Sequence, residues 1–300
     1  MSLGYFLLKI RQKYKHGLQT AFYRDHVRQQ ILASRPVTDT TDTTCEIHVL
    51  TSTTDLLNLI WVLKSFYHFS GRLYSLCIHD DGTLTQEHCD TLQYHFPDSR
   101  IIDRKIAEEK MVSLLKPYPR CLEFRQTNHL SPKVFDFVAY LESDRLLLLD
   151  SDVLFFQEPT ELLKRIESPT YLYNCVNRDI ASAYTVEPTV VRERLNFTMQ
   201  PRFNSGLGLI HKQSINLDWI EEFLGLPGII GHFWRIEQTV LTLCSSKFGV
   251  ELLPEDYEVR LEKGIKGSPC RHYVGVIRHL MYSEGIRHLV QNGFLEELNQ

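Results

Sequence analysis

The chain has 300 residues, of which 43% are hydrophobic, and a formal net charge of −4. This apolar content is enough for a large core in one domain or two, and the slightly acidic balance argues against a general nucleic-acid binder. No apolar run reaches the ~20 residues of a membrane span, and Leu3–Ile10 is too short for a secretory signal. The seven cysteines form no C-x-x-C pair, so we expect a reduced, cytoplasmic protein.

Residues 1–44 are expected to form a basic helical segment followed by a linker, Pro36–Thr44. One interpretation is a helix packed on the domain with a solvated basic face. The alternative is a basic amphipathic helix that brings residues 1–35 to an anionic membrane surface. The apolar side chains that recur at roughly helical spacing are Leu7, Leu8, Tyr14, Leu18 and Phe22.

Strand and helix patterns then alternate, which predicts a parallel sheet with crossover helices. Apolar periodicity and turn residues give the positions of these elements. A segment at 104–130 has no clear pattern. The expected elements are strand Glu46–Leu50, helix 56–67, strand Leu73–Ile78, a helix after the capping-box pair Thr83 and Gln86, strand Arg100–Asp103, and a helix opened by Ser131-Pro132.

The stretch Arg145–Phe156 is the most informative part of the chain. Leu146–Leu149 is a continuous apolar run, typical of a strand buried on both faces. Asp150 and Asp152 follow it directly, and two unpaired carboxylates inside the core would cost several kcal/mol each. We therefore expect the strand to end at Asp150, with both acids in a cleft at the carboxyl edge of the sheet, where they can share a divalent cation.

The second half of the chain has a different order of elements. We expect strands at Tyr171–Val176 and Leu207–His211, irregular structure at 186–202, and a helix at Glu237–Ser246. Arg271–Tyr273 introduces a last ordered stretch. We therefore expect three parts in the chain. Residues 1–44 form the basic segment, residues 45–285 form one domain with a nucleotide-binding half and an acceptor-side half, and residues 286–300 form a C-terminal helix.

The segment Leu148–Phe155 resembles the Asp-x-Asp motif of nucleotide-sugar glycosyltransferases with the GT-A fold. Three further segments occur in the order found in the glycogenin-like retaining group, family eight. Phe203–Gly206 resembles its Asn-[Ser/Ala]-Gly segment, Glu237-Gln238 its Asp-Gln pair, and His272–Arg278 its His-x-x-Gly-x-x-Lys signature. The resemblance implies an α/β GT-A (Rossmann-like) fold, with a mixed, mostly parallel central sheet flanked by helices.

The resemblance also implies roles for twelve residues. Asp150, Asp152 and His272 would bind Mn²⁺ or Mg²⁺, for which oxygen ligands with one imidazole are suitable. Asn204 would hydrogen-bond sugar hydroxyls, Gln238 would steady the sugar face and Glu237 would hold the acceptor. The donor-binding residues would be Thr51, Asp81, Lys133, Ser151, Gly275 and Arg278.

Several of these residues also have an ordinary structural explanation. Asp80 and Asp81 could stabilise a turn with Gly82. Lys133 could be a solvated lysine and Arg278 a surface arginine. His272 could be a hydrogen-bonded structural histidine.

The predicted function is a metal-dependent transfer of a hexose from a nucleotide-diphosphate donor, a UDP-sugar, to a hydroxyl acceptor with retention. The acceptor is a saccharide, a lipid-linked glycan or a protein. Two alternatives remain. One is an inactive nucleotide-sugar-binding protein on the same fold. The other is a phosphatase of the haloacid-dehalogenase type. Asp81–Leu84 mimics part of the motif of those enzymes, but His79 occupies the position of their nucleophilic aspartate.

Overall fold

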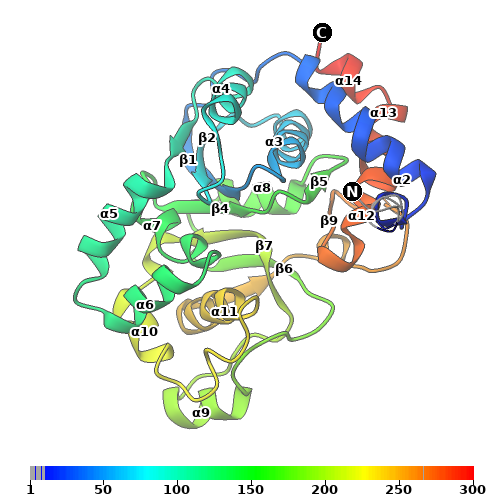
Figure 1. The fold of residues 1–300 in the computed structure, drawn as a ribbon. Helices are drawn as coiled ribbons and strands as arrows, with labels where there is room; N and C mark the ends of the chain where they lie inside the picture. Colours follow the sequence, from blue (N-terminus) through cyan, green and yellow to red (C-terminus); the bar gives the residue numbers. More distant parts are fainter. Residues whose placement is uncertain (1–3, 5–7, 9–10, 266) are drawn as a thin grey trace.

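The computed structural model describes residues 4, 8, 11–265 and 267–300 (Figure 1). In the first half, strands and helices alternate as the sequence predicts. The elements are α2 (Leu18–Phe22), β1 (Asp42–Thr51), α3 (Leu56–Ser70), β2 (Tyr74–Asp80), α4 (Gln86–His95), β3 (Arg100–Ile102), α5 (Arg104–Leu115), α6 (Pro119–Thr127), α7 (Asp136–Tyr140) and β4 (Arg145–Leu149).

The second half combines short strands with helices of very different length. Its elements are β5 (Val153–Phe155), α8 (Thr160–Glu167), β6 (Asn174–Arg178), α9 (Pro188–Leu195), β7 (Phe203–His211), α10 (Leu217–Phe223), α11 (Ile236–Phe248), β8 (Val250–Leu252), β9 (Cys270–His272), α12 (Arg278–Leu280), α13 (Arg287–Gln291) and α14 (Phe294–Glu297). A π-helical turn, Met281–Ile286, joins α12 to α13.

Seven strands form one sheet in the order β3-β2-β1-β4-β7-β6-β8. β1 pairs in parallel with β2 and β4, β2 with β3, and β6 with β8, whereas β7 runs antiparallel to both of its neighbours. The prediction of a mixed, mostly parallel sheet flanked by helices is confirmed. A separate two-stranded sheet pairs β5 with β9.

The leucine run of β4 is buried on both faces, as predicted. Leu147 and Leu149 belong to one apolar core, and Leu146 and Leu148 to a second core on the opposite face. This split follows from the two-residue period of a strand. Figure 1 shows α3 and α8 over one face of the sheet and α10 and α11 over the other.

Several predicted boundaries are wrong, each for a local reason. Thr85, not Thr83, caps α4, because its capping box is closed by His88. Ser131-Pro132 opens only a short 3₁₀ turn, and the α-helix restarts at Asp136. The unpatterned segment 104–130 holds α5 and α6, the supposedly irregular segment 186–202 contains α9, and the end of the predicted linker belongs to β1.

The N-terminal segment packs on the domain most extensively in its second part. Val27 and Ile31 are buried in the core that includes α3, and Trp61 of that helix donates a hydrogen bond to the carbonyl of Arg28 at 2.8 Å. In contrast, Leu18 is 75% exposed and Phe22 55% exposed. The predicted apolar face of this segment is therefore turned outward, while Leu7, which completed the pattern, lies outside the described residues.

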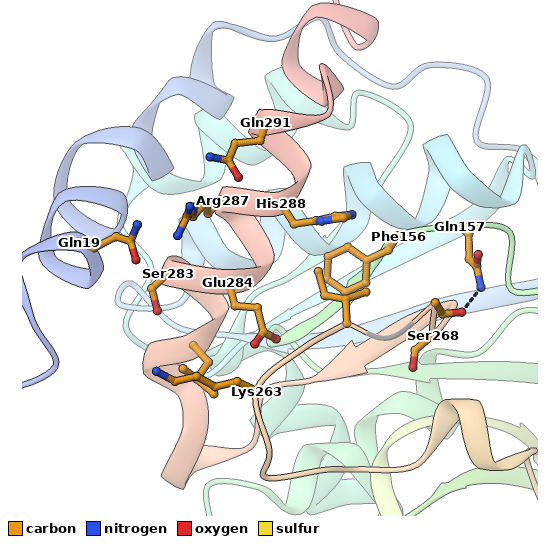
Figure 2. A pocket seen from close by; sticks show the side chains of 13 residues that line it. Gln19, Phe156, Gln157, Lys263, Ser268, Ser283, Glu284, Arg287, His288 and Gln291 are labelled. Carbon is orange, nitrogen blue, oxygen red and sulfur yellow. Dashed lines mark hydrogen bonds between the residues drawn. The ribbon is translucent and has the colours of Figure 1, made fainter.

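A polar cavity of about 630 Å³ is lined in part by α2, the π-helical turn and α13. Residues 156, 157, 263, 265, 267, 268 and 280 line the rest of it. Figure 2 shows Gln19 of α2 facing Ser283 and Arg287 across it, with Lys263 and Glu284 below. None of the predicted site residues lines this cavity. Among the described residues, no helix combines the length and apolarity needed to cross a membrane.

A buried ion pair joins α6 to α7, and we predict that it is important for stability. Arg125 donates two hydrogen bonds to Asp136, at 2.6 and 2.7 Å, and both side chains are almost fully buried. Asp136→Ala leaves the guanidinium without this partner, so the free energy of unfolding should fall by about 3–5 kcal/mol.

Urea unfolding measures this loss. The control is Glu167→Ala, which breaks an ion pair with Arg72 in which both side chains are more than one-third exposed. That change should cost about 0–1 kcal/mol. Equal losses in the two variants would contradict the importance of the buried pair.

Candidate active site

The carboxyl ends of three parallel strands meet at one edge of the sheet. β1 ends at Thr51, β2 at Asp80 and β4 at Leu149. Because β7 is antiparallel to β4, its first residues lie at the same edge, and the amide of Asp150 donates a hydrogen bond to the Gly206 carbonyl at 2.8 Å. This topology brings Asp150 beside the Asn204–Gly206 segment, 54 residues later in the chain.

His272 reaches the same edge through the small second sheet. Val153 and His272 are register partners in the β5–β9 pair, and the amide of Tyr273 donates to the Asp152 carbonyl at 2.9 Å. The imidazole Nε2 then lies 3.0 Å from Asp152 Oδ1 and 4.0 Å from Asp150 Oδ2. Two carboxylates and one imidazole therefore converge, as the sequence predicts.

The hydrogen bonds of Asn204 determine which ring nitrogen of His272 faces the acids. The Gly206 amide donates to Asn204 Oδ1 at 3.0 Å, and Asn204 Nδ2 donates to Asp179 Oδ2 at 3.0 Å, which fixes the orientation of the side-chain amide. Since Oδ1 is an acceptor, His272 Nδ1, 2.9 Å away, must carry a proton. Nε2 is then the nitrogen left to bind a cation, an arrangement common in metal sites.

The three side chains fit a divalent cation. One ligand atom from each of Asp150, Asp152 and His272 lies within 4.8 Å of the others. Burial would raise the pKa of Asp152, but His272 and Arg278 outweigh it and lower this pKa to about 2, so the carboxylate is charged. Its Oδ1 is buried without a hydrogen-bond partner in the described structure, as expected of an atom available for coordination.

Lys133 links the acid pair to Glu237 of α11. Its Nζ lies 2.9 Å from Asp150 Oδ1, 3.3 Å from Glu237 Oε1 and 2.9 Å from the Ser205 carbonyl oxygen, to which it donates. Burial would lower the pKa of Lys133, but the two carboxylates outweigh it and raise this pKa. The interpretation of Lys133 as a solvated lysine is wrong, because its side chain is almost fully buried.

Glu237 is also buried, and burial raises the pKa of its carboxyl group despite the nearby ammonium group of Lys133. Ser205 Oγ donates a hydrogen bond to Glu237 Oε2 at 3.2 Å. The next residue, Gln238, is half-buried, and its Oε1 lies 3.5 Å from both the amide nitrogen and Oγ of Ser205. Both α11 residues therefore lie against the start of β7.

Arg278 forms ion pairs with two carboxylates. Its Nη2 lies 2.7 Å from Asp152 Oδ2, and its Nη1 lies 3.1 Å from Asp55 Oδ1. Sequence reasoning missed Asp55, which precedes α3 and has the appearance of an ordinary helix-capping residue. It also missed Asp179, which accepts from Asn204 and has no motif around it.

All twelve predicted site residues line one cavity of about 660 Å³ at this edge. Thr51 Oγ1 is buried there without a hydrogen-bond partner in the described structure, so it is free to bind a ligand. Asp80 accepts from three backbone amides of the following turn, which confirms the structural explanation for that residue. Trp234, which is 61% exposed, and His129 form an aromatic wall that sequence reasoning missed.

Known proteins resemble this chain in structure but not in sequence. No protein-family model matches the chain, and no curated protein matches it in sequence. Mouse xyloside xylosyltransferase 1, in its apo form, is 12% identical over 77% of this chain and 98% of its own, with a TM-score of 0.52. The galactosyltransferase LgtC, in complex with donor and acceptor sugar analogues, is 13% identical over 82% and 95%, also with a TM-score of 0.52.

A third similar structure is the bifunctional glycosyltransferase WbbM, 12% identical over 88% of this chain and 53% of its own, with a TM-score of 0.51. At these identities the comparison establishes the fold. The chain has the GT-A fold of nucleotide-sugar glycosyltransferases, which confirms the predicted fold class.

Only glycine fits at position 206, and we predict that Gly206→Ala disrupts the site. A Cβ there would lie 2.1 Å from His272 Cε1 and 2.6 Å from Nδ1, so the imidazole would be displaced. We expect loss of divalent-cation binding, measured by titration calorimetry with Mn²⁺.

The matched control is Gly208→Ala in the same strand, whose Cβ would collide with Val176 and the Cys175 carbonyl rather than with His272. Both variants should lose about 1–3 kcal/mol of stability from overpacking. Equal cation binding by the two folded variants would contradict the assignment of His272.

Asn204 provides a test of the imidazole orientation. Asn204→Ala removes the acceptor that holds Nδ1–H, so affinity for Mn²⁺ should fall about 10–100-fold. Asn174→Ala is the control, because Asn174 is a buried asparagine with three hydrogen bonds outside the cavity. A similar fall in both variants would contradict the positioning role of Asn204.

Proposed function

We propose that the protein is a metal-dependent glycosyltransferase that moves a hexose from a nucleotide-diphosphate donor, a UDP-sugar, to a hydroxyl acceptor. The observation that carries the proposal is the convergence of Asp150, Asp152 and Nε2 of His272 at the carboxyl edge of the sheet. Open α/β sheets bind ligands at this edge. A cation there, Mn²⁺ or Mg²⁺, would neutralise the charge that develops on the leaving diphosphate.

The surrounding residues would bind and orient the donor. Thr51 ends β1 and Asp81 directly follows β2, where a base and ribose would fit, and Ser151 and Gly275 line the same cavity. Arg278 is held between Asp152 and Asp55. When a diphosphate enters, the planar guanidinium can exchange one carboxylate for phosphate oxygens.

Lys133 and Asn204 take roles other than those implied by the resemblance. The ammonium group of Lys133 already lies between the two carboxylates and donates to the Ser205 carbonyl, so we propose that it positions Asp150 and Glu237 rather than a phosphate. Both amide atoms of Asn204 are engaged as well, so we propose that it orients His272 rather than binding sugar hydroxyls.

Gln238 and Glu237 would face the transferred sugar and its acceptor. The proposed outcome is retention by front-side displacement, in which the leaving diphosphate takes the proton of the acceptor hydroxyl. A double displacement would need a carboxylate at the back face of the sugar. Glu237 is the candidate, but it is held by Lys133 and Ser205, which favours the front-side route.

The proposed acceptor is a saccharide, a lipid-linked glycan or a protein. We propose a cytoplasmic protein that contacts a membrane peripherally, because the N-terminal segment exposes both apolar side chains, such as Leu18 and Phe22, and basic ones, such as Lys13. The ring of His16 stacks on that of His279, the neighbour of Arg278, with centroids 3.9 Å apart. This segment therefore adjoins the rim of the proposed donor site.

The decisive experiment is titration calorimetry of the protein with UDP, with and without Mn²⁺. We expect binding that requires the metal and is lost in Asp150→Ala. The control is Asp144→Ala, an exposed acid beside the opposite end of β4. Slow hydrolysis of a UDP-sugar with Mn²⁺ then separates an enzyme from an inactive nucleotide-sugar-binding protein. Metal-independent binding would contradict the roles of Asp150, Asp152 and His272.

Membrane contact is tested by sedimentation with vesicles that contain anionic lipid. Leu18→Ser combined with Phe22→Ser should weaken binding at least several-fold, because it removes the outward apolar face. Tyr94→Ser with Ile106→Ser is the control, since these residues are similarly exposed elsewhere. Equal binding by the two double variants would contradict contact through the N-terminal segment.

A further inference from the structure

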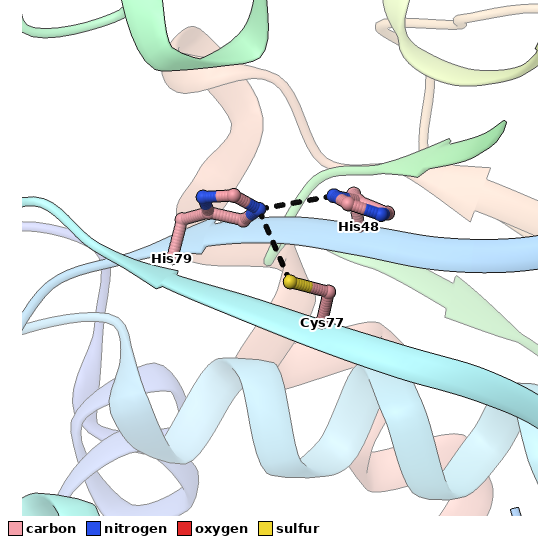
Figure 3. Close-up of side chains that lie close together, drawn as sticks. All are labelled: His48, Cys77 and His79. Carbon is pink, nitrogen blue, oxygen red and sulfur yellow. Dashed lines mark hydrogen bonds between the residues drawn. The ribbon is translucent and has the colours of Figure 1, made fainter. Parts of the chain in front are cut away.

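A row of polar side chains lies in the buried interior, away from the residues assigned above. Glu46, His48, Cys77 and His79 are all buried on β1 and β2. Figure 3 shows both His48 and Cys77 approaching the same ring nitrogen of His79, Nε2. An apolar row would be cheaper to bury, so this group needs a physical explanation.

Strand geometry places these side chains together. Residues two apart in a strand share a face, so Cys77 and His79 project from the same side of β2. In the parallel register His48 is the partner of Cys77, which places His48 beside both. His48 Nδ1 lies 3.0 Å from His79 Nε2, and Cys77 Sγ lies 3.4 Å from the same nitrogen.

Glu46 determines which nitrogen of His48 faces the group. His48 Nε2 lies 3.2 Å from Glu46 Oε2, and Glu46 is paired on its other oxygen with Arg100. A carboxylate oxygen is an acceptor, so the ring proton of His48 belongs on Nε2, and the lone pair of Nδ1 is left facing His79.

A network of hydrogen bonds alone satisfies this group poorly. With a lone pair on His48 Nδ1, His79 must donate from Nε2, and the Cys77 thiol then has no acceptor there. In contrast, a cation would accept electron pairs from both imidazoles and from a Cys77 thiolate at once.

We propose that His48, Cys77 and His79 form a structural site for Zn²⁺. Zn–N bonds of about 2.0–2.1 Å and Zn–S bonds of about 2.3 Å in tetrahedral geometry separate neighbouring ligand atoms by roughly 3.3–3.6 Å, close to the separations observed. One sulfur and two imidazoles suit zinc, whereas the oxygen-rich Asp150 site suits Mn²⁺ or Mg²⁺. Glu46 behind His48 supplies the outer carboxylate typical of zinc-bound histidines.

The site would join β1 to β2 just before both strands reach the candidate active site. The ring of Phe137 covers it, with its centroid 4.7 Å from that of His79 and 5.4 Å from that of His48. Since the ligands are fully buried, the ion would enter during folding and remain bound afterwards. Its contribution is to stability, and it does not depend on the proposed glycosyl transfer.

The test is to produce the full chain in medium with added Zn²⁺, and separately with Co²⁺ in its place. We expect about one equivalent of zinc that survives dialysis against a chelator, and in the cobalt form a near-ultraviolet thiolate-to-cobalt charge-transfer band. The band distinguishes this site from the acid pair, which has no sulfur ligand. Cys77→Ser should abolish the band and lower the melting temperature, while Cys175→Ser, another buried free cysteine, should retain the band.

Two results would overturn the proposal. One is wild-type protein that holds neither zinc nor a cobalt–thiolate band, which would leave a hydrogen-bonded network only. The other is a band that persists in Cys77→Ser. Should Cys77→Ser not fold, His79→Gln serves as the second variant, and the wild-type metal content decides the question without any substitution.

Discussion

The candidate site depends on the pairing of β5 with β9. This short antiparallel pair aligns His272 with Val153 and so brings the imidazole within 3.0 Å of Asp152. Without it, the imidazole of His272 would not lie beside the acid pair at the end of β4. The proton on Nδ1, held by Asn204, then directs the free nitrogen toward the acids.

Charge balance explains why so many ionisable groups can be buried at one sheet edge. The buried carboxylates Asp152 and Glu237 each have a cationic partner within 3.3 Å, as buried charges require. Lys133 bridges Asp150 and Glu237, and Arg278 bridges Asp152 and Asp55. Removing one of these cations therefore leaves a buried carboxylate without its ion-pair partner, so single substitutions here affect both stability and binding.

The sequence was sufficient for the parts of the fold that depend on local patterns. The leucine run predicted a doubly buried strand ending at Asp150, and the resemblance implied that His272 would lie beside the two acids. Asp55 and Asp179 could not be predicted, because their roles arise from contacts across 223 and 25 residues of chain that no local pattern encodes. For the same reason, the buried position of Lys133 was not predictable.

The most direct test of the account is the number of Mn²⁺ ions that the protein binds in the presence of UDP, measured by electron paramagnetic resonance of the free ion. The account predicts one tightly bound ion in the wild-type chain, and a large loss of affinity in Asp152→Asn and in His272→Ala. Undiminished binding of Mn²⁺ in both variants would contradict the claim that these side chains hold the cation.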